Sequence, residues 1–123
     1  MADIQEPPER RSERRYSARI EIFYGLYQYD LLTDYSINLS TGGVFIESSR
    51  ILPEGTEITV KFKLPDSDSI IVTNARVAWT NEPGLLKKEM LPPGMGLQFI
   101  DLSLDNMHLI RSFLEKGEFV PTW

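Results

Sequence analysis

The arginines near the amino terminus are the side chains of this chain best suited to holding an anion. Residues 10–15 read Arg-Arg-Ser-Glu-Arg-Arg, which supplies four guanidinium groups, on Arg10, Arg11, Arg14 and Arg15. A guanidinium group presents a planar fork of donors, which can hold a phosphate or the O6 and N7 edge of guanine in a bidentate manner. Taken alone, such a run is more often a solvated basic segment or a weak patch for an anionic membrane surface.

A second polar motif offers groups that could read a base. Residues 38–43 read Asn-Leu-Ser-Thr-Gly-Gly. Asn38 can donate and accept toward a base edge, and the Ser40 hydroxyl can add a further contact. Gly42 and Gly43 would let the backbone approach a ligand without a side-chain clash. The alternative is a tight β-turn in which Asn38 and Ser40 bond their own backbone. Together the two motifs suit a planar, phosphate-bearing guanine ligand better than they suit catalysis.

Other candidates for chemistry are weaker. His108 is the single histidine of the chain, and it falls in a predicted helix. The acidic residues do not have the spacing of a calcium loop, and the pair Asp30 and Asp34 has no nucleophile or base beside it. Trp79 is most simply a core residue, although an aromatic ring near a barrel mouth could also stack on a base. We therefore expect a receptor with no catalytic residues and no metal site, not an enzyme.

The composition is compatible with a reducing compartment. The 123 residues contain no Cys, which excludes a disulfide scaffold and thiolate metal sites. No apolar run approaches the roughly 18 residues that span a bilayer. The amino terminus has no basic start followed by an apolar stretch, so we see no secretory signal. These features predict a cytoplasmic domain without a membrane span.

The distribution of charge favours a small anion over a nucleic acid. Residues 10–19 hold five arginines against one glutamate, a local charge of +4. Because the whole chain carries −5, the other residues carry −9. A general nucleic-acid binder spreads basic residues over a face so that it neutralises many phosphates. One compact arginine cluster on an acidic body fits a ligand with few phosphates.

Short alternating stretches predict the strands that must position these motifs. The clearest lies at residues 57–64, where apolar Ile58, Val60, Phe62 and Leu64 alternate with polar residues. Further strands are expected at residues 20–25, 31–37, 44–46, 71–79 and 94–99. In the strand at 71–79, strict alternation would put Ala75, Val77 and Trp79 on one face.

One helix is expected near the carboxyl terminus. Ser103 is a credible N-cap for a helix that runs to Lys116, and Gly117 suits its end. Before it, a loop at residues 81–93 carries exposed apolar residues and two lysines. Several short strands and one terminal helix, with no internal repeat, predict a single small antiparallel barrel.

The order of these features resembles the PilZ domain family. An R-x-x-x-R element precedes the first expected strand, as Arg11 to Arg15, and a D/N-x-S-x-x-G element follows the second, as Asn38, Ser40 and Gly43. Further blocks follow in the family's usual order, at residues 43–46, 52–56, 75–79 and 94–99. The resemblance spans nearly the whole chain, and the combination is far more specific than either motif alone.

The resemblance implies an all-β fold with a C-terminal helix, a six-stranded antiparallel PilZ-type β-barrel that binds bacterial cyclic di-GMP. In such domains the arginine segment wraps over the ligand, and the second motif reads it from the barrel surface. Carried over to this chain, Arg11 and Arg15 would hold phosphates and guanine edges. Asn38 and Ser40 would bond a guanine, and Gly43 would leave room for it.

Two registers of the arginine motif are open, because Arg10 and Arg14 also satisfy R-x-x-x-R. We prefer Arg11 and Arg15, since Arg15 then lies closer to the strand that begins near Ala18. Arg10 then precedes the motif, as in family members that bind an intercalated ligand dimer. Arg14 is a possible additional ligand-binding residue.

These inferences predict a cyclic di-GMP receptor that needs no other cofactor. Residues 10–117 would form the PilZ domain, after a flexible segment at 1–9 and before a tail at 118–123. Ligand binding would order the arginine segment and signal to a partner protein. One alternative is a PilZ-like adaptor that binds only proteins through the loop and the tail. Another is a barrel that binds single-stranded nucleic acid, against which the acidic body counts.

Overall fold

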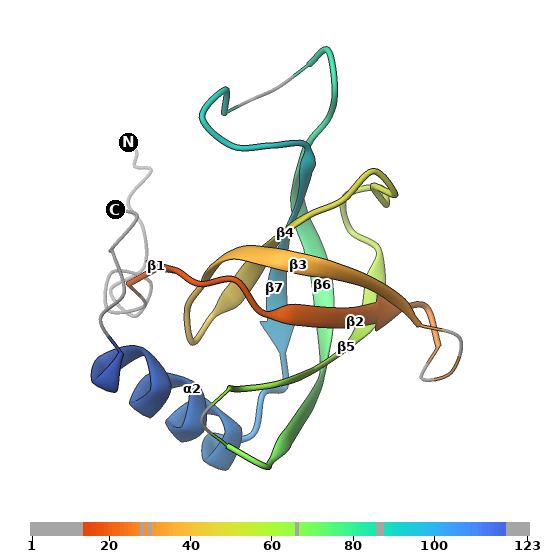
Figure 1. Ribbon diagram of the computed structural model, residues 1–123. Coiled ribbons are helices and arrows are strands. Elements are labelled where there is room, and N and C mark those ends of the chain that lie inside the picture. Colours follow the sequence, from red (N-terminus) through yellow and green to blue (C-terminus); the bar gives the residue numbers. More distant parts are fainter. Residues whose placement is uncertain (1–13, 28, 30, 66, 86–87, 118–123) are drawn as a thin grey trace, which may run out of the picture.

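The computed structural model describes residues 14–27, 29, 31–65, 67–85 and 88–117 (Figure 1). The expectations for Arg10, Arg11, the segment at 1–9 and the tail at 118–123 therefore lie outside the described residues. The elements, in chain order, are β1 (Tyr16–Ser17), β2 (Glu21–Gly25), β3 (Leu32–Leu39), β4 (Gly43–Glu47), β5 (Glu57–Lys63), β6 (Ile70–Asn81), β7 (Gly94–Ile100) and α2 (Leu104–Lys116). None of the helical segments in the described part of the chain has the length and apolarity needed to cross a membrane.

Six of the strands form a closed antiparallel barrel. The hydrogen-bonded order is β3-β2-β5-β6-β7-β4, and β4 pairs with β3 to close the ring. The short strand β1 adds to the outer part of β3, where Tyr16 pairs with Leu39 and Ser17 with Asn38. The predicted six-stranded barrel with a C-terminal helix is confirmed. The sequence did not predict β1, because a strand of two residues is too short to give a recognisable alternation.

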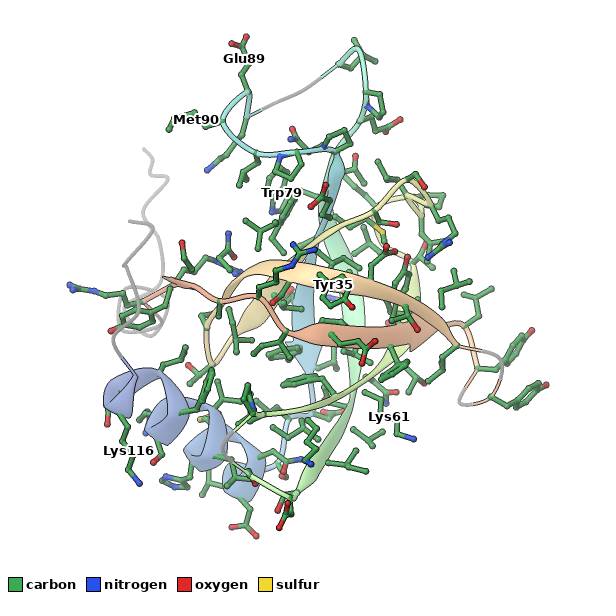
Figure 2. All side chains as sticks on the ribbon, viewed as in Figure 1. Tyr35, Lys61, Trp79, Glu89, Met90 and Lys116 are labelled. Carbon is green, nitrogen blue, oxygen red and sulfur yellow. The ribbon has the colours of Figure 1, made fainter. Side chains whose placement is uncertain are left out.

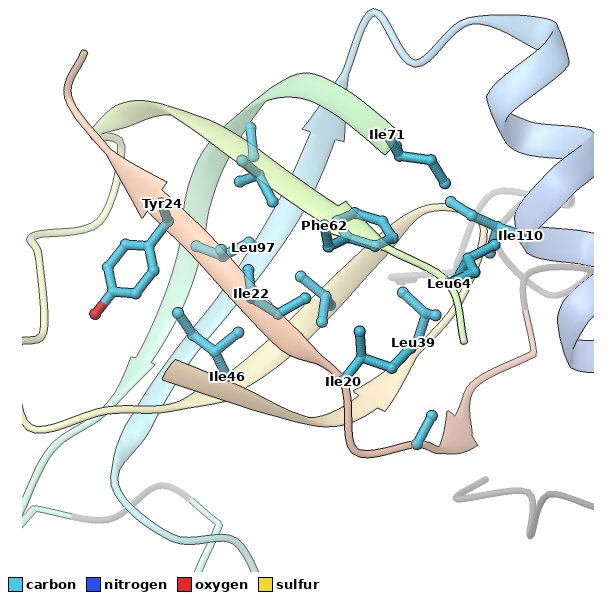
Figure 3. Close-up of a cluster of buried hydrophobic side chains, with 14 of the residues drawn as sticks. Ile20, Ile22, Tyr24, Leu39, Ile46, Phe62, Leu64, Ile71, Leu97 and Ile110 are labelled. Carbon is cyan, nitrogen blue, oxygen red and sulfur yellow. The ribbon is translucent and has the colours of Figure 1, made fainter. Parts of the chain in front are cut away.

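The side chains that fill the barrel come from every long strand, because each strand alternates between an inward and an outward face. In β5 the apolar residues Ile58, Val60 and Phe62 are buried, which confirms the predicted alternation. Figure 3 shows that the cluster of buried side chains extends to α2, where Ile110 lies beside Leu64 at one end of the core. The helix thus acts as a lid on the barrel.

The helix begins and ends where the sequence predicts. The Ser103 side chain accepts a hydrogen bond from the backbone N–H of Asn106 at 3.1 Å, which satisfies one of the free amides of the first turn. The Gly117 N–H donates to the Phe113 carbonyl at 3.1 Å. Gly117 has φ of −81°, so its role at the helix end does not draw on the left-handed freedom of glycine.

One side chain holds β1 and β2 in line. Ser36 is fully buried in β3, and its hydroxyl accepts from the Ile20 N–H at 2.8 Å and donates to the Ala18 carbonyl at 2.5 Å. The segment between β1 and β2 departs from the strand ladder here, and Ser36 supplies the partners that the ladder lacks. Because β1 follows Arg15 directly, Ser36 also helps to fix the carboxyl end of the segment that carries the arginines.

A polar cluster lies at the end of the core opposite α2. Tyr24 is fully buried along its ring, and its hydroxyl points out of the apolar cluster (Figure 3). That hydroxyl donates to Asp34 Oδ2 at 2.5 Å and lies 2.9 Å from Ser48 Oγ. Arg50 Nη2 contacts the same carboxylate oxygen at 3.2 Å. Burial, and after it the hydrogen bond to Asp34, raises the pKa of Tyr24 above its usual 10.0.

Alkaline conditions should therefore weaken the fold through Tyr24. The unfolded tyrosine loses its proton near pH 10, whereas the folded one retains it. The contribution of Tyr24 to the free energy of unfolding is therefore fully present below pH 10 and is lost as the pH rises through the folded pKa. Tyr24→Phe should cost about 1–2 kcal/mol at pH 7, because Asp34 and Ser48 lose a partner. Urea unfolding of both proteins from pH 7 to about pH 11 should show this difference shrinking at the alkaline end. A difference that stays constant with pH would contradict this account of Tyr24.

Candidate ligand-binding site

Two β-bulges turn polar and aromatic side chains to the outside of the barrel. The β3–β4 register shifts between Ser36 and Asn38, and the β6–β7 register shifts between Val77 and Trp79. Each extra residue reverses the facing of the residues after it in the strand. Asn38 therefore faces outward although Ser36 faces inward. The expectation that Trp79 shares the face of Val77 is wrong for the same reason.

The bulges bring four residues into one row on the outer surface. Asn38 of β3 pairs with Phe45 of β4, Phe45 pairs with Gly96 of β7, and Gly96 pairs with Trp79 of β6. Paired residues in antiparallel strands project from the same face. The row is therefore continuous across four strands, with an amide at one end and an indole at the other.

The middle of the row is an aromatic floor, which we define as Phe45 and Trp79. Their rings stack with centroids 5.2 Å apart and an interplanar angle of 26°. The indole can lie across β7 only because Gly96 has no side chain there, since a Cβ on Gly96 would overlap Trp79 Nε1 and Cδ1. Phe45 is 2% exposed, whereas Trp79 is half-buried. Trp79 is thus the ring of the floor that a planar ligand could reach.

A guanidinium group is joined to the amide end of the row. Arg15 Nη1 donates to Asn38 Oδ1 at 2.7 Å, across the pairing of β1 with β3. Asn38 is 1% exposed, and this bond occupies its carbonyl oxygen. Arg14, the neighbouring residue, is exposed and also lines the cavity described below. The two sequence motifs therefore meet in space through Arg15 and Asn38.

The serine of the second motif organises its own turn. Ser40 Oγ accepts from the backbone N–H groups of Gly42 and Gly43 at 3.0 and 3.2 Å, and Ser40 is 1% exposed. This is the turn-forming role that the sequence left open for Ser40. Asn38, in contrast, lies within β3 and not in the turn. Ser40 and Gly42 nevertheless line the cavity, so the conformation of this turn determines the form of the cavity wall at that point.

Gly43 is placed differently from the other motif residues. It pairs with Gln98 at the start of β4 and is not among the residues that line the cavity. A Cβ on Gly43 would overlap the carbonyl oxygen of Leu97. The close approach of β4 to β7 is thus a sufficient reason for glycine at this position, independent of any ligand.

A cavity of about 780 Å³ lies over the row. Besides the motif residues and the aromatic floor, its lining includes Lys88, Gln98, Asp101 and Met107 in the first turn of α2. Among its described lining residues the cations are Arg14, Arg15 and Lys88, and the single carboxylate is Asp101. The charged side chains that line the cavity therefore have a net positive charge, although the whole chain has a net charge of −5. This arrangement fits a planar ligand with a small negative charge.

Several residues of the cavity escaped the sequence-based prediction. Phe45 reads as an ordinary strand residue, and Lys88 as part of an exposed loop. The signal for Phe45 is visible only in the register, because its partner Gly96 makes room for Trp79. His108 does not line the cavity. The described residues contain no group of three or more His, Asp or Glu that could hold a metal ion.

Comparison with known proteins gives a family and several similar folds. The family model described as PilZ domain matches residues 9–116. The Bacillus subtilis inhibitor of motility, MotI/DgrA, has 22% identity and a TM-score of 0.66, over 91% of this chain and 57% of its own. The PilZ domain of YcgR from Escherichia coli, solved with c-di-GMP, has 17% identity and a TM-score of 0.61, over 87% of this chain and 93% of its own.

A third similar structure is the PilZ domain of CeSA from a cellulose-synthesizing bacterium. It has 18% identity and a TM-score of 0.55, over 82% of this chain and 97% of its own. No curated protein matches the chain in sequence. The chain spans 57% of the length of MotI/DgrA, so the resemblance to that protein concerns only part of it.

Proposed function

This chain belongs to the PilZ domain family, and on that premise we propose that it is a receptor for cyclic di-GMP. The observation that carries the proposal is the row of Asn38, Phe45, Gly96 and Trp79 with Arg15 bonded to its end. The row supplies a hydrogen-bonding amide, an aromatic surface and a guanidinium group within one cavity. The family relative YcgR, whose PilZ domain was solved with c-di-GMP, supports the choice of ligand.

Each part of the cavity matches a part of the ligand. Cyclic di-GMP has two phosphates and two planar guanines, and the lining formed by the described residues holds three cationic side chains against one carboxylate. Arg15 would bond a phosphate or the O6 and N7 edge of a guanine in a bidentate manner. Asn38 would use its amide donors on a base, and Trp79 would stack on one. Ser40 and Gly42 would hold the turn against the ligand.

The hydrogen bond between Arg15 and Asn38 supports the register of Arg11 and Arg15. Arg15 lies beside Asn38 of the second motif, whereas Arg14 is an exposed residue in the lining of the cavity. Under this register Arg10 and Arg11 would close over the ligand from the preceding residues. Like charges in this segment repel one another, and an anion removes that repulsion. Ligand binding would thereby order the segment and create a surface for a partner protein.

Calorimetric titration of cyclic di-GMP into the protein tests the proposal. We expect binding in the micromolar range, near −8 kcal/mol, because three or four charge-assisted hydrogen bonds of about 1.5–3 kcal/mol each must also offset ordering of the segment. The ligand-to-protein ratio would show whether Arg10 recruits a ligand dimer. Linear pGpG, which has the same bases without the ring closure, is the control and should bind more weakly. Absence of binding heat at any workable concentration would overturn the proposal.

A protein-binding adaptor is the second candidate. Leu85 and Met90, in the loop between β6 and β7, are 78% and 97% exposed. Apolar side chains this open to water are typical of a surface that a partner covers. If the protein fails to bind cyclic di-GMP, this loop becomes the best candidate for its function.

A further inference from the structure

The cavity has a cation at each end of its row. Arg15 lies at the amide end, and the Lys88 ammonium lies over the Trp79 ring, 5.9 Å from its centroid. Both line the same cavity. We propose that Lys88 is a further ligand-binding residue, which contacts a phosphate of the bound anion from the side opposite the arginine segment. The proposal rests on the proposed function, and neither sequence motif contains this residue.

Lys88 is an exposed loop residue whose backbone is nonetheless fixed. Asn81 Oδ1 accepts from the Lys88 N–H at 3.0 Å, and Asn81 Nδ2 reaches the Lys88 carbonyl at 3.0 Å. The same Nδ2 lies 3.1 Å from the carbonyls of both Leu91 and Pro92. Asn81 is fully buried at the end of β6. One side chain thus ties the returning arm of the loop to the barrel.

These hydrogen bonds of Asn81, which we call the Asn81 clamp, explain why a loop lysine could contribute to binding. A lysine on an unrestrained loop loses backbone and side-chain freedom when it contacts a ligand, which offsets most of the gain from an exposed charge. Here the backbone of Lys88 is already held, so the cost is limited to the side chain. The ammonium lies over the indole ring, so a base that stacks on Trp79 would displace it from the ring, and the phosphate joined to that base would be the anion nearest to it. Asn81 is then a positioning residue, because it acts through Lys88.

Replacement of Lys88 with methionine tests the contact. Lys88→Met should weaken cyclic di-GMP binding about fivefold to tenfold, a value between those of an exposed ion pair and a charged hydrogen bond. Lys61→Met is the matched control: it removes the same charge from β5, outside the cavity (Figure 2), and should leave the affinity within about twofold. The difference in cyclic di-GMP affinity between the two variants should become smaller in high salt, because the proposed contact is electrostatic.

A double-mutant cycle tests the role of Asn81. Asn81→Ala should weaken binding about as much as Lys88→Met, and the double variant should bind no more weakly than either single variant. If Asn81 acted independently of Lys88, the losses of binding free energy in the two single variants would add in the double variant. Thermal unfolding of each variant without ligand would exclude a loss of fold as the cause.

The outcomes separate this inference from the proposed function. If the unaltered protein binds no cyclic di-GMP, the proposed function fails, and the role of Lys88 fails with it. If the unaltered protein and Lys88→Met bind equally well, only the role of Lys88 is overturned. If Lys88→Met and Lys61→Met weaken binding equally, the effect is one of net charge, and the contact is again overturned.

Discussion

Replacing Arg15 with alanine is expected to weaken cyclic di-GMP binding about 10-fold to 100-fold. The guanidinium group is half-buried and bonded to Asn38 at 2.7 Å, so it is held beside the cavity before the ligand arrives. Its removal deletes a charge-assisted contact of about 1.5–3 kcal/mol, and every 1.4 kcal/mol changes affinity tenfold. It also leaves the carbonyl oxygen of Asn38, which is 1% exposed, without this donor. Calorimetric titration would measure the loss directly.

Arg50→Ala is the matched control for this experiment. Arg50 also carries a guanidinium group, but it contacts Asp34 at the opposite end of the barrel core and does not line the cavity. The Arg50 side chain is about half exposed, so its ion pair with the partly buried Asp34 contributes only modestly to stability. Affinity should therefore stay near that of the unaltered protein. If Arg15→Ala binds as well as Arg50→Ala, the arginine motif does not hold the ligand and the transfer of the family motif to this residue is wrong.

Gly43→Ala is expected to destabilise the protein by about 2–3 kcal/mol, before any ligand is added. The new Cβ would overlap the carbonyl oxygen of Leu97 and lie 3.3 Å from the Cα of Gln98. Both are backbone atoms of β7, which cannot rotate away as a side chain can, so β4 and β7 must separate. A loss of this size corresponds to a fall of about 10 °C in Tm for a domain of this length. Thermal and urea unfolding of the ligand-free protein would measure it.

Gly25→Ala is the comparison that isolates the cause. Neither Gly25 nor Gly43 has a positive φ, so both lose the same backbone freedom on substitution. At Gly25 the new Cβ would come 3.2 Å from Leu31 Cδ2, the end of a side chain that can move. We expect little change there. If Gly43→Ala were as stable as Gly25→Ala yet failed to bind cyclic di-GMP, then room for the ligand, and not the approach of β7, would be the reason for this glycine.

The barrel could be predicted because its strands alternate without interruption over most of their length. In β5 apolar and polar residues alternate along the whole strand, and the inward residues Ile58, Val60 and Phe62 are all buried, although Thr59 is buried too. The helix could be predicted from Ser103 and Gly117, which act within a few residues of the chain. Local chemistry of this kind is fully visible in a sequence.

The outer row could not be predicted, because it depends on two single-residue insertions in strand pairing. A bulge is defined by two strands together, and neither Ile37 nor Ala78 has a side chain that marks one. Without the bulges, Asn38 would face the core with Ser36, and Trp79 would face it with Val77. Of the residues named from the motifs, the cavity is lined by Arg14, Arg15, Asn38, Ser40 and Gly42, while Gly43 lies outside it. The orientation of Asn38 and the aromatic floor follow only from the register of the strands.

The clamp on the β6–β7 loop was also hidden from the sequence. Asn81 reads as the polar start of a loop, which is a common position for asparagine. Its importance comes from complete burial and from the carbonyls of Leu91 and Pro92 that converge on it. Those contacts span up to 11 residues and depend on how the loop returns.

The closure of the barrel has a consequence for the order in which the protein acquires its site. β4 and β7 pair Glu47 with Gly94 and Gly43 with Gln98, separations of 47 and 55 residues along the chain. Pairings that close such long loops form late, since their entropic cost precedes their gain. During synthesis from the amino terminus, both ligand motifs emerge well before the strand that carries Gly96. A nascent chain that ends before β7 would thus contain both motifs and both rings of the aromatic floor, but not the strand that joins β4 to β6 and brings those rings together.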